Sequence, residues 1–99
     1  MKLRFEWDLA KAKNNFKKHR VSFETATRVF ADPLAAIEQD RCENGEHRWQ
    51  TLGIVGGYLL LLVAHTVRHD DDGTEVIRII SARRADSKER TRYEQNFSL

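Results

Sequence analysis

Cysteine, proline and long apolar runs are all scarce in this chain of 99 residues. Its single cysteine, Cys42, cannot form an internal disulfide or supply a metal site built from several thiolates. The longest apolar run, residues 58–64, is far too short to cross a bilayer as a helix. The first residues also lack the apolar stretch of a signal peptide. We therefore expect a cytoplasmic protein with no membrane segment.

Recognisable cofactor and metal motifs are absent as well. Gly56 and Gly57 indicate a tight hairpin turn, not a glycine-rich phosphate loop. The four histidines show no metal-ligand spacing, and no serine lies in a nucleophile elbow. A Ser-His-Asp triad assembled by folding stays open. The sequence therefore predicts neither a cofactor nor a bound metal.

The charged residues are numerous and unevenly placed. They make up 32% of the chain beside 40% hydrophobic residues, a balance typical of a folded domain. A chain of this length supports one core, so we expect a single domain over residues 1–99. The net charge is only +2, yet residues 11–20 hold five basic residues and residues 38–46 hold four acids. The basic segment suits nucleic acid, although an ordinary solvated surface carries the same mixture.

Two amphipathic helices are expected near the start of the chain. Asp8 and Ser22 are good N-caps, and apolar residues recur at helical spacing over residues 9–19 and 23–30. Pro33 ends the second helix, because the residue before a proline is pushed out of the α region.

A run of strands and a last helix follow. Apolar patterns predict strands over residues 34–39, 48–54, 58–67 and 75–82, with a polar loop over residues 40–46. Asp86 with Glu89 forms a capping-box pattern, which opens a helix to about Asn96. The order indicates an α+β fold with two N-terminal helices, a four-stranded antiparallel sheet and a C-terminal helix.

The last predicted strand carries arginines in an apolar setting. Strict alternation divides it into two faces, namely Ile77, Ile79, Ser81 and Arg83 against Val76, Arg78, Ile80 and Ala82. A charge in so apolar a strand is costly without a partner. Arg78 is therefore either a ligand-binding group or half of a structural ion pair with Glu46, Glu75 or an aspartate. Guanidinium groups fixed by a strand can hold phosphate oxygens through a rigid fork of donors.

Arginine, glutamate, histidine and tyrosine without metal ligands form a set that suits metal-independent RNA cleavage. In that reaction the ribose 2′-hydroxyl attacks the adjacent phosphate, which needs a base, an acid and fixed cations. Arginine supplies the cations, and glutamate or histidine supplies the proton transfers. His65 lies at the end of a buried strand, where a histidine is more often a core group than a catalyst.

Several stretches of the chain are together similar to one known family. They read FEWD at residues 5–8, KHRVSFE at 18–24, GEHRW at 45–49, RIISAR at 78–83 and ERTRYE at 89–94. In this order, and over nearly the whole chain, they closely resemble the BrnT family of bacterial type II toxins. The family commonly has a glycine after the Lys-His pair, where this chain has Arg20. A left-handed turn there costs arginine about 1 kcal/mol more than glycine.

The resemblance implies a RelE-like ribonuclease toxin that cuts RNA, blocks translation and arrests growth. It also implies a BrnA-like antitoxin with a ribbon-helix-helix DNA-binding part, and toxin dimers bridged by antitoxin in a heterotetramer. Operator DNA is then contacted only through the antitoxin. The alternative is a non-catalytic module that binds antitoxin or nucleic acid in autoregulation of the operon.

The resemblance and the strand pattern together supply candidate site residues. Those expected to be catalytic are Glu46, Arg48, His65, Arg78, Arg83 and Tyr93. Those expected to contact RNA are Lys18, Arg68, Arg84, Arg90 and Arg92. Within the first set, the two arginines of the last strand stabilise phosphate, Glu46 or His65 is the base, and Tyr93 orients or donates a proton. Core packing is an equal possibility for Tyr93 and the favoured role of both tryptophans.

Overall fold

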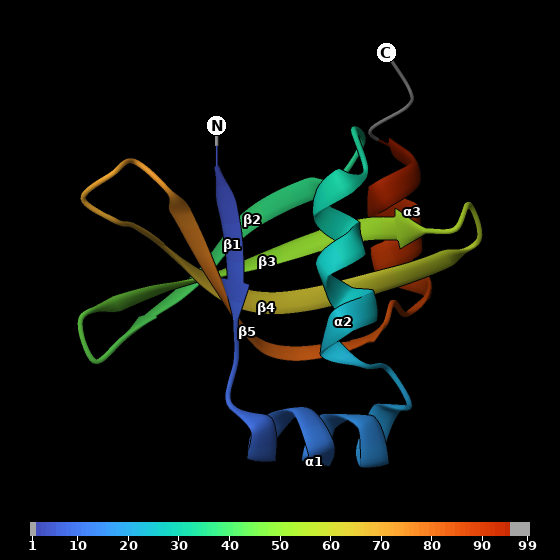
Figure 1. Ribbon diagram of the computed structural model, residues 1–99. Helices are drawn as coiled ribbons and strands as arrows, with labels where there is room; N and C mark the ends of the chain where they lie inside the picture. The colour runs from blue at the N-terminus through green and yellow to red at the C-terminus, as the bar shows by residue number, and fades with distance from the viewer. Residues whose placement is uncertain (1, 96–99) are drawn as a thin grey trace.

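The computed structural model describes residues 2–95 of the chain. Figure 1 shows the order of its helices and strands. In chain order they are β1 (Leu3–Glu6), α1 (Leu9–His19), α2 (Phe23–Ala26), η1 (Thr27–Ala31), β2 (Ala36–Glu43), β3 (Glu46–Val55), β4 (Leu59–His69), β5 (Glu75–Arg84) and α3 (Ser87–Gln95). The predicted α+β class is confirmed, and the predicted end of the last helix at Asn96 lies outside the described residues.

The sheet has five strands in the order β1-β5-β4-β3-β2. The expected four-stranded, wholly antiparallel sheet was wrong in one respect, because β1 adds a fifth strand that runs parallel to β5. This pairing joins Leu3 to Glu75 and so brings together two segments far apart in the chain (Figure 1). Phe5 of β1 packs against Phe30, with ring centroids 5.4 Å apart, so burial of its ring favours the edge pairing.

The helix ends follow from their caps. Asp8 Oδ1 accepts a hydrogen bond from the Lys11 amide at 3.0 Å, as predicted for the N-cap of α1. Arg20 at the other end adopts the left-handed conformation with φ 60°, so the costly turn is present. Ser22 caps α2, but the second predicted helix tightens into the 3₁₀ segment η1. None of the helices within residues 2–95 combines the length and apolar character needed to traverse a bilayer.

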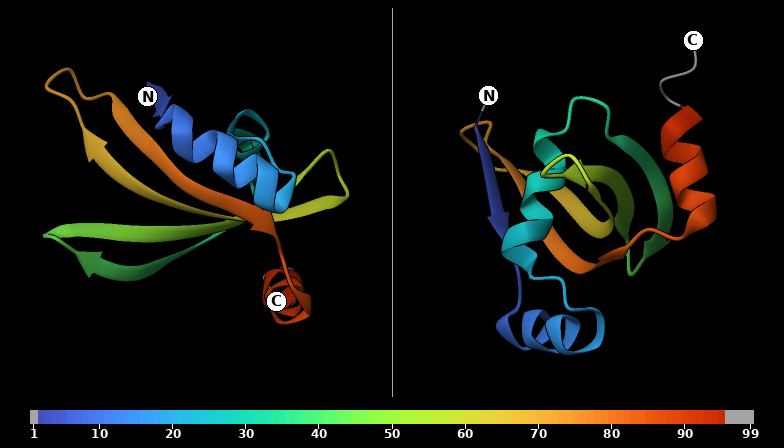
Figure 2. Two further views of the ribbon diagram at one scale, coloured as in Figure 1. Left: turned by 90° about the horizontal axis from the view of Figure 1, so that it is seen from below. Right: turned by 90° about the vertical axis from the view of Figure 1, so that its right-hand side faces the viewer.

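Helices cover the two faces of the sheet unequally, as Figure 2 shows. On one face α1, α2 and η1 cover the larger core, which includes Phe23, Leu61 and Ile79. On the other face α3 covers a smaller core that includes Leu62 and Tyr93. The helix α3 covers only one end of this face, beyond the last residues of β5 (Figure 2). We call the face on which α3 lies the open face, and divide it into an α3 end and a hairpin end at the opposite tips of the strands.

A β-bulge in β5 changes the predicted faces of its arginines. The register between β4 and β5 skips Ile80, which has no direct partner in β4. Ala82 consequently points into the larger core, whereas strict alternation put it on the same face as Arg78. Arg83 correspondingly moves onto the open face, which it shares with Arg78. The predicted division of this strand was therefore wrong beyond Ile80, because one extra residue reverses every later assignment.

Candidate active site

The β2–β3 and β4–β5 hairpins diverge at the hairpin end of the sheet (Figure 2). Direct pairing between β3 and β4 begins only at Trp49 with His65, so the start of β3 and the end of β4 are separated. A cleft of about 650 Å³ lies between them, which we call the hairpin cleft. Its lining residues are Ile37, Asn44, Gly45, Glu46, His47, Trp49, Val67, Arg68 and His69.

An Asn-Gly turn positions the start of β3 beside this cleft. Asn44 and Gly45 have positive φ values of 54° and 76°, the pattern of a two-residue type I′ hairpin turn. The strands close with Glu43 opposite Glu46. The polar loop predicted over residues 40–46 was therefore wrong, since both strands extend up to this turn. The Asn-Gly pair is itself the sequence signal that predicts it.

Two ion pairs occupy the open face at the hairpin end. Arg78 Nη2 donates a hydrogen bond to Glu46 Oε1, which joins β5 to β3 across β4. Arg68 donates two hydrogen bonds to the Glu6 carboxylate, at 2.8 and 3.1 Å. These bonds lower the pKa of the Glu6 carboxyl below its usual range. Glu46 and Arg68 also line the hairpin cleft, so these two ion pairs lie at its rim.

Three rings gather in the same cleft. His47 and Trp49 come from the face of β3 that lies away from the open face, because Trp49 pairs directly with His65, and His69 comes from the end of β4. His47 Nδ1 lies 2.8 Å from Gln39 Nε2, so the amide donates to Nδ1 and the ring proton is on Nε2. The histidines seemed scattered in the sequence, because only the two diverging hairpins bring them together. The alternation of β3 was the one signal that linked His47 to Trp49.

Arg48 lies on the open face, on the opposite side of β3 from His47 and Trp49, and is paired with a different carboxylate. Its Nε is 3.3 Å from a carboxylate oxygen of Glu43, across the β2–β3 hairpin. The side chain is only one-quarter exposed. Arg48 therefore pairs within the hairpin that carries Glu46.

The other two predicted catalytic residues on the open face lie at the α3 end. Arg83 holds Glu89 in a two-pronged ion pair, both bonds at 2.8 Å, and this lowers the pKa of the Glu89 carboxyl. Glu89 also completes the predicted capping box, since it accepts from the Asp86 amide while Asp86 accepts from the Glu89 amide. Arg83 therefore fastens the first turn of α3 to the end of β5.

Tyr93 is held in the smaller core under α3. Its hydroxyl donates to Asp32 Oδ2 at 2.5 Å, and the same carboxylate accepts from the Ile54 and Leu34 amides. Burial, together with this hydrogen bond, raises the pKa of the Tyr93 hydroxyl to about 12. Burial alone would raise the pKa of Asp32, but its three hydrogen bonds outweigh it and hold that pKa below the usual range. Tyr93 thus anchors α3 to the segment before β2.

His65 lies on the helix-covered face and is only 1% exposed. Its Nε2 is 2.7 Å from the Thr51 hydroxyl, and its ring packs edge-on against Phe30 at 4.9 Å. Burial lowers its pKa to about 4, so the ring is neutral near pH 7. The structure therefore separates His65 from Arg78 by the thickness of the sheet, and of the two predicted bases only Glu46 lies at the hairpin cleft.

The residues predicted to contact RNA do not form one patch. Arg68 lies in the hairpin cleft, whereas Arg92 pairs with Glu38 at 3.3 Å beside α3. Arg84 and Arg90 are exposed around the start of α3. Lys18 is on α1, on the other side of the sheet. The structure thus brings Glu46, Arg48, Arg68 and Arg78 to the hairpin end and leaves the remaining predicted residues elsewhere.

Arginines and a glutamate on the open sheet face, beside a cleft with aromatic side chains, are groups of the kind that bind phosphate oxygens. No cluster of side chains that could hold a metal ion occurs among residues 2–95. Residues 7–89 match the family described as "Ribonuclease toxin, BrnT, of type II toxin-antitoxin system". The chain belongs to this BrnT family of ribonuclease toxins, as the resemblance of its motifs indicated, and a toxin of this type has a cognate antitoxin.

A solved structure supports the fold assignment. The chain is similar to the crystal structure of the Brucella abortus ribonuclease toxin BrnT, with a TM-score of 0.66. The two are 22% identical, and the similarity covers 88% of this chain and 100% of the other. At that identity the likeness shows a shared fold. No curated protein matches the chain.

Proposed function

We propose that this toxin cleaves RNA in the hairpin cleft without a metal, by attack of a ribose 2′-hydroxyl on the adjacent phosphate. The observation that carries the proposal is the position of Glu46, which lines the cleft and is paired with Arg78. A carboxylate and a guanidinium are thereby held together beside a space large enough for a nucleotide. General base and cation are the two groups that this reaction needs most.

In the proposed reaction Glu46 accepts the proton of the 2′-hydroxyl, and the freed oxygen attacks phosphorus. The bond from phosphorus to the 5′-oxygen then breaks. The leaving 5′-oxygen takes up a proton from water, and Glu46 later releases the proton it accepted to solvent. The products are a 2′,3′-cyclic phosphate and a free 5′-hydroxyl, so no water is consumed.

The arginines of the hairpin end take the role of transition-state cations. Arg78 and Arg68 each carry a carboxylate partner at about half-exposed positions, where an ion pair contributes little stability. An incoming phosphate replaces or shares these partners at small cost, because it accepts the same fork of hydrogen bonds. The partly buried Trp49 offers a ring face on which a base stacks.

The partner proposed for this toxin is a BrnA-like antitoxin with a ribbon-helix-helix DNA-binding part. Support comes from the membership in a type II toxin family, which requires an antitoxin. In this proposal toxin dimers are bridged by antitoxin in a heterotetramer, and operator DNA is contacted only through the antitoxin. Released toxin cuts RNA, blocks translation and arrests growth.

The test incubates purified, antitoxin-free toxin with a mixed-sequence RNA in excess EDTA and maps the product ends. We expect 2′,3′-cyclic phosphate ends, and a loss of roughly 10²–10⁴-fold in rate for Glu46→Gln, the range for removing a general base. Glu38→Gln is the matched control, because Glu38 is a paired carboxylate on the same face beside α3. Its rate should equal that of the wild type.

Three results would contradict the proposal. Cleavage that disappears with EDTA would show a metal-dependent reaction. Intact RNA with wild-type toxin, together with tight antitoxin binding, would leave a non-catalytic binding module. Equal losses in Glu46→Gln and Glu38→Gln would place the active site away from the hairpin cleft.

A further inference from the structure

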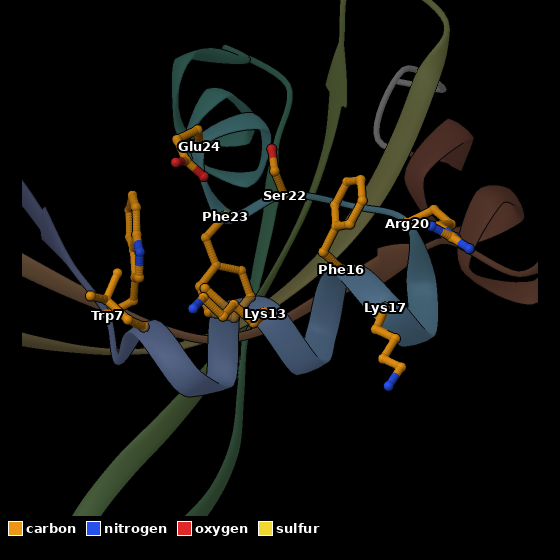
Figure 3. A pocket seen from close by; sticks show the side chains of 10 residues that line it. Trp7, Lys13, Phe16, Lys17, Arg20, Ser22, Phe23 and Glu24 are labelled. Atoms are coloured by element: carbon orange, nitrogen blue, oxygen red, sulfur yellow. The ribbon is translucent and has the colours of Figure 1, made fainter.

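A second hollow, on the helix-covered side of the sheet, lies between α1 and α2 (Figure 3). We call it the helix groove, and its volume is about 520 Å³. Its lining residues are Trp7, Leu9, Ala12, Lys13, Phe16, Lys17, Arg20, Ser22, Phe23 and Glu24. None of these residues lines the hairpin cleft, so the two hollows are separate surfaces.

The walls of the helix groove are fixed by the fold. Asn15, which is buried in α1, donates to the Val21 and Ala82 carbonyls at 3.1 and 2.8 Å and accepts from the Ala82 amide at 3.1 Å. These bonds tie α1 both to the segment before α2 and to β5. Phe23 and Trp7 meet edge-to-face at 5.9 Å and close the floor. A preformed groove loses little conformational entropy when a partner binds.

Apolar side chains are left uncovered along the groove. Leu9 is 74% exposed and Phe16 is also exposed, although both are large hydrophobic residues. In Figure 3 Phe16 projects from α1 toward Ser22, beside the guanidinium of Arg20. Grouped apolar side chains of this kind on a folded surface mark a binding site for another apolar surface.

The groove is also basic. Lys13, Lys17 and Arg20 line it, against Glu24 as the one acid among its lining residues. Within residues 2–95 no carboxylate forms an ion pair with these three cations, in contrast to the paired arginines of the open face. Arg20 instead lies over the Phe16 ring at 5.9 Å, from a left-handed backbone conformation that arginine rarely adopts.

We propose that the helix groove binds an amphipathic segment of the cognate antitoxin, with apolar side chains on one side and acidic residues flanking them. This inference rests on the family membership, which supplies the antitoxin, and goes beyond the cleavage chemistry. Uncovered aliphatic and aromatic groups favour a protein over RNA, because a phosphate backbone does not bury them. The unpaired cations favour an acidic segment through charge complementarity. The antitoxin therefore has an anchor outside the hairpin cleft.

The test measures the affinity of the full-length antitoxin, expressed from the gene paired with that of the toxin, for variants in matched pairs. Lys13→Glu in the groove is compared with Lys11→Glu, since both are exposed lysines on α1 and both change the net charge equally. Phe16→Ser is compared with Tyr58→Ser, because Tyr58 is a 79% exposed aromatic outside the groove. Each groove variant should raise the antitoxin Kd at least tenfold, and each control less than twofold.

RNA cleavage and the oligomeric state of the toxin alone are measured on the same variants. Unchanged cleavage in the groove variants is expected. Equal effects of Lys13→Glu and Lys11→Glu on antitoxin affinity would overturn the proposal in favour of diffuse attraction, and so would an unchanged Kd in both groove variants. Loss of RNA affinity with an unchanged Kd would assign the groove to RNA.

The remaining outcome concerns a second copy of this chain. If Phe16→Ser dissociates a toxin dimer and leaves the antitoxin Kd unchanged, the groove is a dimer surface and the proposal fails. Failure of the cleavage proposal is distinguishable from all of these results. Wild-type toxin that leaves RNA intact still gives a Kd for antitoxin, and the matched variants still report on the groove.

Discussion

The two ends of the open face use the same kind of ion pair for different purposes. At the α3 end, Arg83 grips a Glu89 side chain that is only 14% exposed and also caps a helix. At the hairpin end, Arg78 holds a Glu46 side chain that is 48% exposed and borders a cleft. A buried partner makes the pair part of the structure, because its loss leaves an unpaired charge. An exposed partner can be exchanged for a ligand, because water and salt already weaken the pair.

The largest effect that would sharpen this comparison is expected from Arg78→Ala. Removing one fixed transition-state cation should lower the cleavage rate by roughly 10²–10³-fold. Thermal stability should barely change, since the lost pair is exposed. Single-turnover cleavage and thermal unfolding measure the two quantities. Arg4→Ala is the control, because Arg4 forms an exposed pair with Asp70 at 3.1 Å, and a similar rate loss there would remove the special role of Arg78.

Low pH should reduce the stability of the fold through His65, which lies on the helix-covered face and at neither end of the open face. Its folded-state pKa of about 4 lies below the ordinary 6.5, so the unfolded state binds the extra proton between these values. Stability is then fully present above pH 6.5 and falls as the pH drops toward 4, by on the order of 3 kcal/mol. Denaturant unfolding across this range measures it.

The matched variants for the acid experiment are His65→Gln and His69→Gln. His65→Gln should have a lower stability at pH 7 but a nearly flat profile between pH 6.5 and pH 4. His69 is exposed, so His69→Gln should keep the slope of the wild type. Parallel slopes in the two variants would contradict the assignment to His65.

A smaller effect, at the α3 end, is expected from Arg83→Ala. Glu89 would then be left half-buried without its two hydrogen bonds, which costs about 2 kcal/mol. For a domain of this size, that corresponds to a fall in Tm of roughly 10 °C. The cleavage rate per folded molecule should stay unchanged. Arg84→Ala, at the exposed neighbouring residue, is the control. A lower cleavage rate with an unchanged Tm would show that Arg83 acts in catalysis, and the contrast between the two ends of the open face would fail.

The smallest effect is expected from Glu6→Gln at the hairpin end. The pair with Arg68 is exposed and weakened by water, so stability should be nearly constant. The Glu6 carboxylate would no longer compete with phosphate for the Arg68 guanidinium, so RNA should bind more tightly and the KM should fall. Steady-state cleavage kinetics measure this change. A raised KM would mean that Glu6 positions Arg68 for RNA and does not compete with it.

Local signals in the sequence predicted most of the elements correctly. Asp8 and Ser22 start their helices as expected, and the Asp86–Glu89 capping box opens α3. These features depend on residues three or four apart, so the sequence contains them in full. The strand β1 escaped prediction because its partner is β5, at the far end of the chain. The bulge at Ile80 escaped because alternation carries no sign of an inserted residue.

The sequence predicted which types of residue form the candidate site better than it predicted which of them lie together. Glu46 and Arg78 were both predicted to be catalytic, and Glu46 was one of several partners predicted for an Arg78 ion pair; the structure brings the two into contact. His65 was assigned from its chemistry and Tyr93 from the family resemblance, yet burial gives both side chains partners in the interior. His47 and His69 line the hairpin cleft only because two hairpins diverge, and no short-range sequence pattern predicts that divergence.

The parallel pairing of β1 with β5 also determines when the sheet can finish folding during synthesis of the chain. Leu3 leaves the ribosome long before its partner Glu75 exists, so β1 waits unpaired while the other strands are made. Contacts between such distant segments form late and slowly. Glu6 and Arg78 become neighbours in the sheet only once β5 has joined it. A nascent or prematurely ended chain therefore has no completed hairpin end until β5 is in place.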